Sequence, residues 1–168
     1  MADTRPAFNQ DRASCTILIA VTDVVVSRAG LQELGELLPL VEGYRSFCKR
    51  AASDRTERYL RDRIVNDEAI VFIARQDGSP MAFTLIYPTF STTALAPIWL
   101  LSDLFVTEQA RGRGVASALM EEVERAAREA GAARIWLRTG HDNAAAQALY
   151  EGRGWVRNDV LRRYDLIL

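Results

Sequence analysis

Residues 99–130 constrain the fold most, because an apolar segment, a glycine turn and an amphipathic segment follow one another there without a break. Residues 99–106 are rich in large apolar side chains and hold one acidic side chain, Asp103, which is typical of a buried strand. After the turn, apolar side chains recur at three- and four-residue spacing, the pattern of one helix face: Val115, Leu119, Val123, Ala126 or Ala127, and Ala130. The sequence therefore predicts a core strand that leads through a glycine turn into a helix.

The turn itself, Arg111-Gly112-Arg113-Gly114, is typical of an anion site. The first backbone N–H groups of a helix lack partners within it and carry partial positive charge. Two glycines let the backbone approach a ligand closely, so a phosphate or pyrophosphate is the favoured anion. A P-loop is excluded because residues 115–116 are Val-Ala where Lys and Ser or Thr are needed. A dinucleotide fingerprint is excluded because Ser117 stands in place of its third glycine.

The composition indicates one globular domain. The chain has 168 residues, 49% of them hydrophobic and 26% charged, which suits a single sizeable core. With 21 basic and 22 acidic residues the net charge is −1, which disfavours nucleic acid and anionic membranes as partners. Cys15 and Cys48 match neither a disulfide framework nor a zinc pattern, so no metal is expected. The N-terminus lacks an apolar signal segment, so a cytoplasmic location is expected.

The rest of the chain predicts further helices and strands around this unit. Residues 1–14 are expected to form a flexible tail, and residues 15–168 a single domain. The other predicted elements are strands at 16–26, 69–75, 81–87, 134–139, 155–156 and 164–168, and helices at 29–52, 54–65 and 143–151. Pro39 is expected to break or kink the first helix, so that two helices meet near it, Pro88 to end the strand at 81–87, and Gly131 to stop the long helix. An Asp77-Gly78 hairpin and the helical crossovers together predict an α/β fold with a central mixed β-sheet flanked by helices.

Two motifs at a fixed separation resemble the conserved blocks of the GNAT superfamily of N-acetyltransferases. The first is Arg-x-x-Gly-x-Ala, formed by Arg111, Gly114 and Ala116, which is similar to that family's coenzyme A signature. The second has the form N-x-x-A-x-x-L-Y-x-x-x-G-[FW], matched by Asn143, Ala146, Leu149, Tyr150, Gly154 and Trp155. The segments YRSF at 44–47, YPTFS at 87–91 and DLFV at 103–106 look like a small subgroup labelled histone- or polyamine-acetyltransferase-like. The resemblance covers residues 100–155 directly and implies a single GNAT-type domain.

The resemblance implies where acetyl-CoA binds. Its pyrophosphate would lie on backbone N–H groups of the glycine turn, at Arg111, Gly112, Arg113, Gly114, Val115 and Ala116. Its pantetheine arm would pair like an added strand with backbone groups of Leu104, Phe105 and Val106, and an N–H near Val106 would polarise the thioester carbonyl. Asn143 would orient the pantetheine or cap its own helix, and the Arg113 side chain would contact phosphate or remain solvated. The residues leave both pairs of alternatives open.

Tyr150 is the general acid that the resemblance implies. Acetyl transfer expels a thiolate, and a tyrosine with a pKa of about 10 is protonated at neutral pH and can donate to it. The acceptor ammonium, with a pKa of about 10.4, must lose a proton before it can attack. Asp103 is the expected base, directly or through water, with a structural carboxylate as the alternative. Related enzymes often carry an acid where Ser102 stands here, which leaves the base open.

The predicted function is transfer of an acetyl group from acetyl-CoA to a primary amine of a polyamine, amino acid or peptide. Tyr44 and Tyr87 are expected to line the acceptor pocket on family position alone, and His141, the only histidine, has no assigned role. The alternative function is a catalytically weak module that binds acetyl-CoA as a sensor or assembly subunit. A homodimer is expected, because residues 164–168 would end the chain at an open sheet edge.

Overall fold

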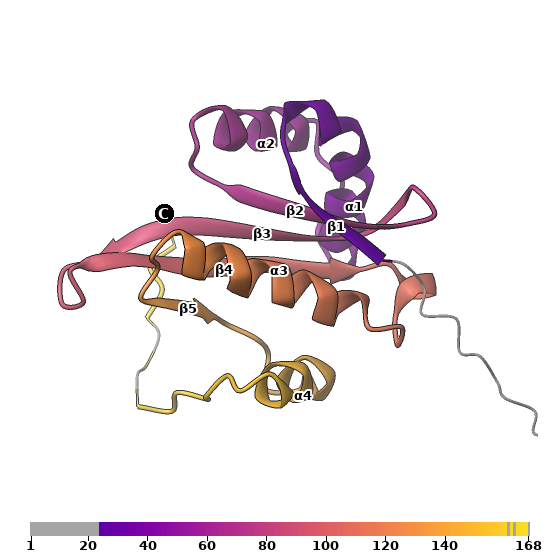
Figure 1. The fold of residues 1–168 in the computed structure, drawn as a ribbon. Helices are drawn as coiled ribbons and strands as arrows, with labels where there is room; N and C mark the ends of the chain where they lie inside the picture. The colour runs from indigo at the N-terminus through magenta and orange to yellow at the C-terminus, as the bar shows by residue number, and fades with distance from the viewer. Residues whose placement is uncertain (1–23, 161, 163, 168) are drawn as a thin grey trace, which may run out of the picture.

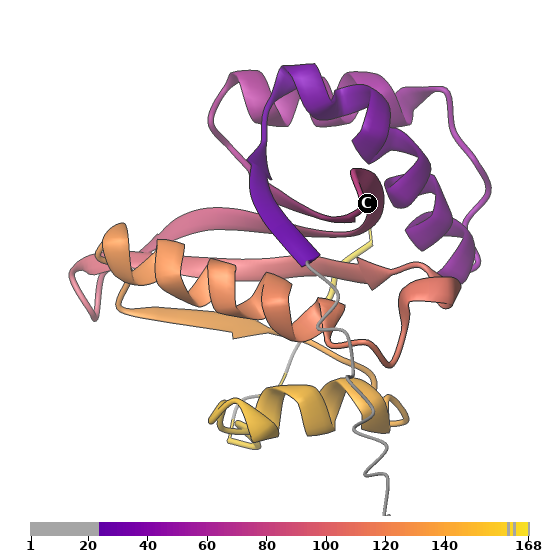
Figure 2. The same ribbon diagram turned by 45° about the vertical axis from the view of Figure 1, so that its right-hand side comes forward.

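A five-stranded sheet separates two helices on one face from two helices on the other (Figures 1 and 2). The computed structural model describes residues 24–160, 162 and 164–167. Helices α1 and α2 lie on one side of the sheet, whereas α3 and α4 lie on the opposite side. The elements, in chain order, are β1 (Val24–Ala29), the 3-10 helix η1 (Leu31–Glu33), α1 (Leu34–Phe47), α2 (Arg55–Val65), β2 (Ile70–Gln76), β3 (Ser79–Ser91), β4 (Ala96–Val106), the 3-10 helix η2 (Glu108–Ala110), α3 (Val115–Glu129), β5 (Arg134–Leu137) and α4 (Ala144–Gly152).

The strands lie in the order β1-β2-β3-β4-β5, and the sheet is mixed. The first three pairings are antiparallel: short connections join β2 to β3 and β3 to β4, whereas α1 and α2 lie between β1 and β2 in the chain. The pairing of β4 with β5 is parallel, because α3 carries the chain back across the sheet between them. The predicted α/β fold with a mixed sheet and flanking helices is confirmed.

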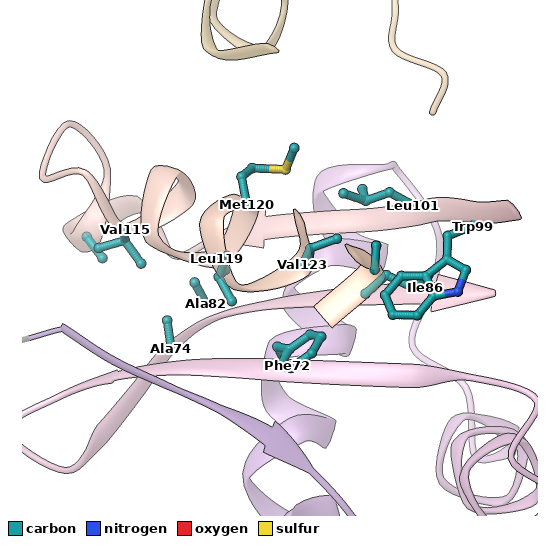
Figure 3. Close-up of a cluster of buried hydrophobic side chains, with 12 residues drawn as sticks. Phe72, Ala74, Ala82, Ile86, Trp99, Leu101, Val115, Leu119, Met120 and Val123 are labelled. Carbon is teal, nitrogen blue, oxygen red and sulfur yellow. The ribbon is translucent and has the colours of Figure 1, made fainter. Parts of the chain in front are cut away.

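Two apolar clusters fill the two sides of the sheet. On one side the buried face of α3 packs on the sheet, with Val115, Leu119 and Val123 against Phe72 and Ile86 among others (Figure 3). This is the face that the spacing of apolar residues predicts for the long helix. On the other side α1 packs through Leu34, Leu37, Leu40 and Val41, and Phe83 and Leu85 of β3 belong to the same cluster. The sheet is therefore covered on both faces, and β3 is its central strand.

A β-bulge interrupts β4 at Ser102. Asp103 pairs with Leu85 and Leu101 pairs with Ile86, so Ser102 is the additional residue between two consecutive pairs. One additional residue exchanges the faces to which the following side chains point. Before the bulge Leu101 is buried in the α3-side cluster, whereas after it Phe105 packs against the cluster under α1.

Two prolines behave differently from the sequence-based expectation. Pro39 lies inside α1, which runs from Leu34 to Phe47 as one helix, so the predicted break is wrong. The proline ring costs α1 the bond that an N–H at this position would donate to the carbonyl of Gly35, and packing of the buried face of α1 on the sheet offsets that loss. Pro88 lies within β3, which continues to Ser91, so the predicted strand end there is wrong as well. The pairing of β3 with β2 ends at Ile86, and a proline is tolerated beyond that point because β3 has a free edge there.

The C-terminal part of the chain differs from the prediction too. Residues 155–156 and 164–167, expected as two strands, form no strand in the described part of the chain. Leu168 and most of the predicted strand at 16–26 lie outside the described residues, and β1 begins at Val24. Among the described helices, none is long and apolar enough to cross a membrane.

Candidate active site

The edge of β4 that faces β5 opens at the middle of the strand. The parallel ladder runs from the pair Ile98–Arg134 to the pair Leu101–Leu137 and ends there. Residues 103–106 continue to pair with β3, but in the described chain they have no partner on the β5 side. An open edge of this kind can take an extended ligand through backbone hydrogen bonds. Leu104, Phe105 and Val106, the residues predicted to hold the pantetheine arm, lie on this segment.

The glycine turn connects the open edge to the start of α3. Gly112 and Gly114 have φ values of +73° and +78°, a left-handed conformation that residues with a Cβ rarely adopt. The first helical bond runs from Ala118 N to Gly114 O at 3.0 Å, and no side chain caps the helix. The N–H groups of Val115 and Ala116 therefore have no partner within the helix and are suited to an anion.

The two arginines of the turn differ in their surroundings. The Arg111 guanidinium donates through Nε to the carbonyl of Val106 at 3.2 Å and lies 5.5 Å from the centre of the Phe47 ring. Arg111 thus ties the turn to the end of β4 and to the C-terminal end of α1. The Arg113 side chain is exposed, and no hydrogen bond or ion pair to another described side chain involves it.

A pocket of about 790 Å³ lies between the sheet and helices α1 and α2, on the face of β4 that is opposite to α3. Asp103, Tyr44 and Tyr87, the three residues expected around the acceptor, all line it. Asp103 reaches this side only because the bulge at Ser102 exchanges the faces of the strand. The Tyr44 ring packs at 6.1 Å from both the Phe83 and the Phe105 rings, which fixes it at the pocket wall.

Asp103 holds its proton more strongly than an ordinary aspartate. Burial raises its pKa above the usual value, and hydrogen bonds from Ser102 and Tyr44 act in the opposite direction. The Ser102 hydroxyl lies 3.3 Å from Asp103 Oδ1. A carboxylate with a raised pKa is a stronger base once it is ionised, which suits the removal of a proton from an acceptor.

Tyr44 and Tyr87 stay protonated at neutral pH. Burial raises the pKa of Tyr44, and the negative charge of Asp103 raises it further. Burial also raises the pKa of Tyr87, whose hydroxyl lies 2.8 Å from that of Tyr59 on α2. Tyr59 was not expected from the sequence. The sequence feature that could have indicated Tyr59 is its spacing from Arg55 and Arg58: the latter two are three residues apart and Tyr59 is four residues after Arg55, so all three lie on one face of α2.

Tyr150 lies on the other side of β4 and does not line this pocket. It packs against the α3-side cluster, and its ring centre lies 5.8 Å from that of Trp155. Burial raises its pKa, so the phenol is protonated at neutral pH. Asn143 begins the helix that carries Tyr150, and its side chain accepts a hydrogen bond from Ala146 N at 3.2 Å. The capping alternative for Asn143 is therefore present in the structure.

A hydrogen-bonded network that the sequence did not suggest fixes the end of α4 against α3. The Arg153 guanidinium donates to both oxygens of Glu124, at 3.0 and 2.9 Å, and to Ser117 Oγ at 2.9 Å. Trp155 Nε1 donates to Glu124 Oε1 at 3.0 Å. These contacts lower the pKa of Glu124, chiefly through the hydrogen bonds from Arg153. The network holds the segment that follows Tyr150, so it positions that residue indirectly.

The remaining candidate groups lie apart from these features. His141 is exposed in the loop before α4, where its carbonyl accepts a hydrogen bond from Gln147 at 3.0 Å. Cys48 is a free, exposed thiol at the pocket, whereas Cys15 lies outside the described residues. In residues 24–160, 162 and 164–167 no three His, Cys, Asp or Glu side chains gather as a metal site would require.

Comparison with known proteins places this arrangement in a known context. The sequence profile described as "Acetyltransferase (GNAT) family" matches residues 37–155. YhfO of Bacillus subtilis (strain 168), named an uncharacterized N-acetyltransferase, is 34% identical over 142 residues, which are 84% of this chain and 95% of YhfO. The [ribosomal protein bS18]-alanine N-acetyltransferase of Escherichia coli (strain K12) is 31% identical over 116 residues, 69% of this chain and 68% of that enzyme.

A solved structure agrees with the sequence matches. The crystal structure of a probable acetyltransferase superposes with a TM-score of 0.81 at 31% sequence identity. The superposition covers 86% of this chain and 97% of the other. The residues matched by the family profile contain β4, the glycine turn, α3 and α4 on one side of the site, and α2 with most of α1 on the other.

Proposed function

This chain belongs to the acetyltransferase (GNAT) family, and from that premise we propose that it transfers the acetyl group of acetyl-CoA to a primary amine of a small molecule or peptide. The chain is an acetyltransferase by its family and by its named relatives. The proposal adds the acceptor class and the roles of individual residues. A relative named for N-acetylation of an alanine of a ribosomal protein supports an amine as the acceptor.

The described residues fit acetyl-CoA at two places. Free N–H groups at the start of α3, behind two glycines with positive φ, suit the pyrophosphate. The open edge of β4 at residues 103–106 suits the amide groups of the pantetheine arm. When bound there, acetyl-CoA supplies a thioester carbon that an amine can attack.

The acceptor would enter from the other side of β4. In this proposal the pocket beneath α1 and α2 holds the amine, and Asp103 takes the proton that the ammonium must lose, directly or through water. The amine nitrogen then forms a bond to the acetyl carbon and the carbon–sulfur bond breaks. Tyr150 gives its proton to the departing thiolate, so CoA leaves as a thiol. The nitrogen loses a second proton to water and becomes the neutral amide, and water returns a proton to Tyr150.

The observation that carries the proposal is the bulge at Ser102. It places Asp103 in the acceptor pocket, while the neighbouring Leu104 and Val106 pack on the side of α3 and Tyr150. Acceptor and donor groups can therefore meet across one short segment of β4. A direct transfer needs this arrangement, because both substrates must be bound together.

The experiment is CoA-thiol release from acetyl-CoA with a panel of polyamines, amino acids, aminoglycosides and short peptides. Turnover with at least one class is the expected result. If no amine is acetylated but acetyl-CoA still stabilises the protein, by about 2.7 kcal/mol at a hundredfold excess over Kd, a binding module replaces the proposed enzyme. Absence of both effects would contradict the assignment of the glycine turn.

A further inference from the structure

The acceptor pocket has an uneven distribution of charge. Four arginines line it, Arg45, Arg50, Arg55 and Arg58, against two aspartates, Asp62 and Asp103. The chain as a whole is nearly neutral, with a net charge of −1, so this excess of positive charge is local. It comes from α1, α2 and the segment between them, whereas Asp103 comes from the sheet.

The arginines of the pocket are not equally engaged. Arg45 donates to the carbonyl of Ala51 at 2.7 Å and lies 3.6 Å from a Glu42 oxygen, so it has a structural partner. Arg58 lies 3.8 Å from Asp62. Among the described residues, Arg50 and Arg55 have no carboxylate within 4.0 Å of their guanidinium groups. Two exposed guanidiniums thus face the pocket with their hydrogen-bond donors available.

The groups on the sheet side of the pocket have a different chemistry. On the sheet side, Asp103 provides a carboxylate, and Tyr44 and Tyr87 line the same pocket. An ammonium would be attracted to this carboxylate, whereas a carboxylate of the ligand would be attracted to the arginines above it. The pocket therefore has one place for a cation and a separate, larger place for an anion.

We propose that the acceptor is a small amine that also carries a carboxylate, as an amino acid does, with its amine toward Asp103 and its carboxylate toward Arg50 and Arg55. This inference rests on the proposed function, since it names the class of amine that the enzyme acetylates. Guanidinium groups bind carboxylates through paired, charge-assisted hydrogen bonds, which gives both affinity and orientation. A polyamine or aminoglycoside would place additional positive charges beside four arginines, which is unfavourable.

The first test compares acceptors that differ only in the carboxylate. L-ornithine is compared with putrescine, and L-lysine with cadaverine, by the rate of CoA-thiol release. We expect kcat/KM to be at least about tenfold higher for the member with a carboxylate, as one good charge-assisted contact would give. Equal values, or a preference for the diamine, would overturn the inference and leave the proposed acetyltransferase intact.

The second test removes the available guanidiniums. Arg50→Gln, Arg55→Gln and the double variant are compared with Arg61→Gln, which lies on α2, pairs with Glu57 and does not line the pocket. The pocket variants should raise KM about tenfold for L-ornithine and lower KM for putrescine, because less positive charge then repels the diamine, with KM for acetyl-CoA unchanged. Arg61→Gln should change none of these constants. A rise in KM for acetyl-CoA instead would assign the arginines to the donor and overturn the inference.

A binding measurement separates this inference from the proposed function. Calorimetric titration of L-ornithine and putrescine into the protein needs no turnover. If no acceptor is acetylated, yet L-ornithine binds and the double variant loses that binding, the acetyltransferase proposal fails while the carboxylate site stands. If turnover occurs but binding shows no preference for the carboxylate, the site assignment fails while the enzyme stands.

Discussion

Four side chains beside β4 keep their protons more firmly than in water. Burial raises the pKa of Asp103, Tyr44, Tyr87 and Tyr150. For Tyr150 the consequence is a phenol that is fully protonated at neutral pH and ready to donate. For Asp103 the consequence is a carboxylate that is a stronger base when it is ionised, and whose ionisation lowers the stability of the folded state.

Replacement of Tyr150 by phenylalanine tests its proposed role as general acid. The ring contact with Trp155 is apolar and would remain, so the fold should be preserved. We expect kcat to fall by about 10²-fold or more, with acetyl-CoA binding unchanged. Single-turnover kinetics together with calorimetry of acetyl-CoA would measure the two effects separately. Unchanged turnover would remove Tyr150 from the mechanism.

Replacement of Asp103 by asparagine should separate activity from stability. A raised pKa means that the folded state holds the proton of Asp103 more strongly than the unfolded state does. The stability due to that proton is complete below the unfolded pKa of about 3.9 and is lost as the pH rises through the raised value. We therefore expect Asp103→Asn to unfold at a higher temperature than the wild type at pH 7, by about 2–4 °C for each kcal/mol regained. Its advantage should shrink toward pH 4, while kcat falls by about 10²-fold.

The exposed Asp54, which makes no side-chain cap for α2, provides the matched control. Asp54→Asn should change neither the melting temperature nor kcat. Melting curves and rates collected between pH 4 and pH 8 would test both variants together. A lower melting temperature for Asp103→Asn at pH 7 would indicate that the carboxylate has a structural role.

At the scale of elements, the turn before α3 needs glycine at position 114 for its backbone conformation and not because a side chain would lack room. An added Cβ at Gly114 would meet no heavy atom within 4 Å, but the φ of +78° would be strained for any other residue. The strain of such a residue is about 1–3 kcal/mol, and relief of it would move the N–H groups at the start of the helix. The function of the turn therefore depends on its shape.

We expect Gly114→Ala to raise KM for acetyl-CoA about tenfold, because about 1.4 kcal/mol of binding would be lost with the distorted N–H groups. Arg113→Gln should have a smaller effect, because the Arg113 side chain is exposed and the backbone groups remain in place. Gly35→Ala, inside α1 with nothing within 4 Å of the added Cβ, is the control for a neutral glycine replacement. A larger effect at Arg113 than at Gly114 would favour recognition by charge.

Sequence patterns predicted the features that depend on residues nearby in the chain, and missed those that depend on how one strand pairs with another. The α3 face, Gly131 and the Asn143 cap agree with their patterns, because helix signals act within a few residues. The bulge at Ser102 depends on how β4 pairs with β3, which lies outside any local window. The continuation of β3 through Pro88 also depends on a neighbouring strand, because β2 stops pairing with β3 at Ile86, before the proline.

The candidate site shows the same division. Asp103 followed from its position as the acidic side chain of the central strand, and Tyr44 and Tyr87 from the resemblance to a family. The structure brings these three to one pocket, although their roles stay predictions. Arg50 and Arg55 escaped notice, because arginines are spread over the whole sequence and no spacing separates these two from the rest. Their proximity to Asp103 arises only when α1 and α2 pack on the sheet.

At the scale of the whole molecule, residues far apart in the sequence hold the two sides of the active site in place. Glu124 of α3 and Arg153 after α4 form a paired contact whose side chains are only 14% and 19% exposed. Ser117 and the Trp155 indole complete its hydrogen bonds. This network joins the helix that starts at the glycine turn to the helix that carries Tyr150.

Removal of one partner should therefore affect both stability and catalysis. Arg153→Met leaves a mostly buried carboxylate without its main donor, and we expect a loss of about 1–3 kcal/mol in the free energy of unfolding. If Tyr150 acts as the proposed general acid, kcat should decline as α4 loosens, and by more than any change in KM for the acceptor. Urea unfolding and steady-state kinetics would measure the two effects.

Arg125→Gln provides the comparison on the same helix. Arg125 pairs with Glu122 and Glu129 on the exposed face of α3, where ion pairs contribute little to stability. We expect no measurable change in unfolding or kcat for this variant. Equal effects of the two substitutions would show that the network around Glu124 has no special role.

The bulge in β4 also has a consequence for directed evolution of this enzyme. Side chains at 103 and 105 face the acceptor side, whereas those at 99 and 101 belong to the packing beneath α3. A library restricted to the first pair could thus alter substrate preference and leave the hydrophobic packing of the α3 side untouched. If Ser102 were instead paired as an ordinary strand residue, the side chains at 99, 101, 103 and 105 would all share one face, and this independence would be lost.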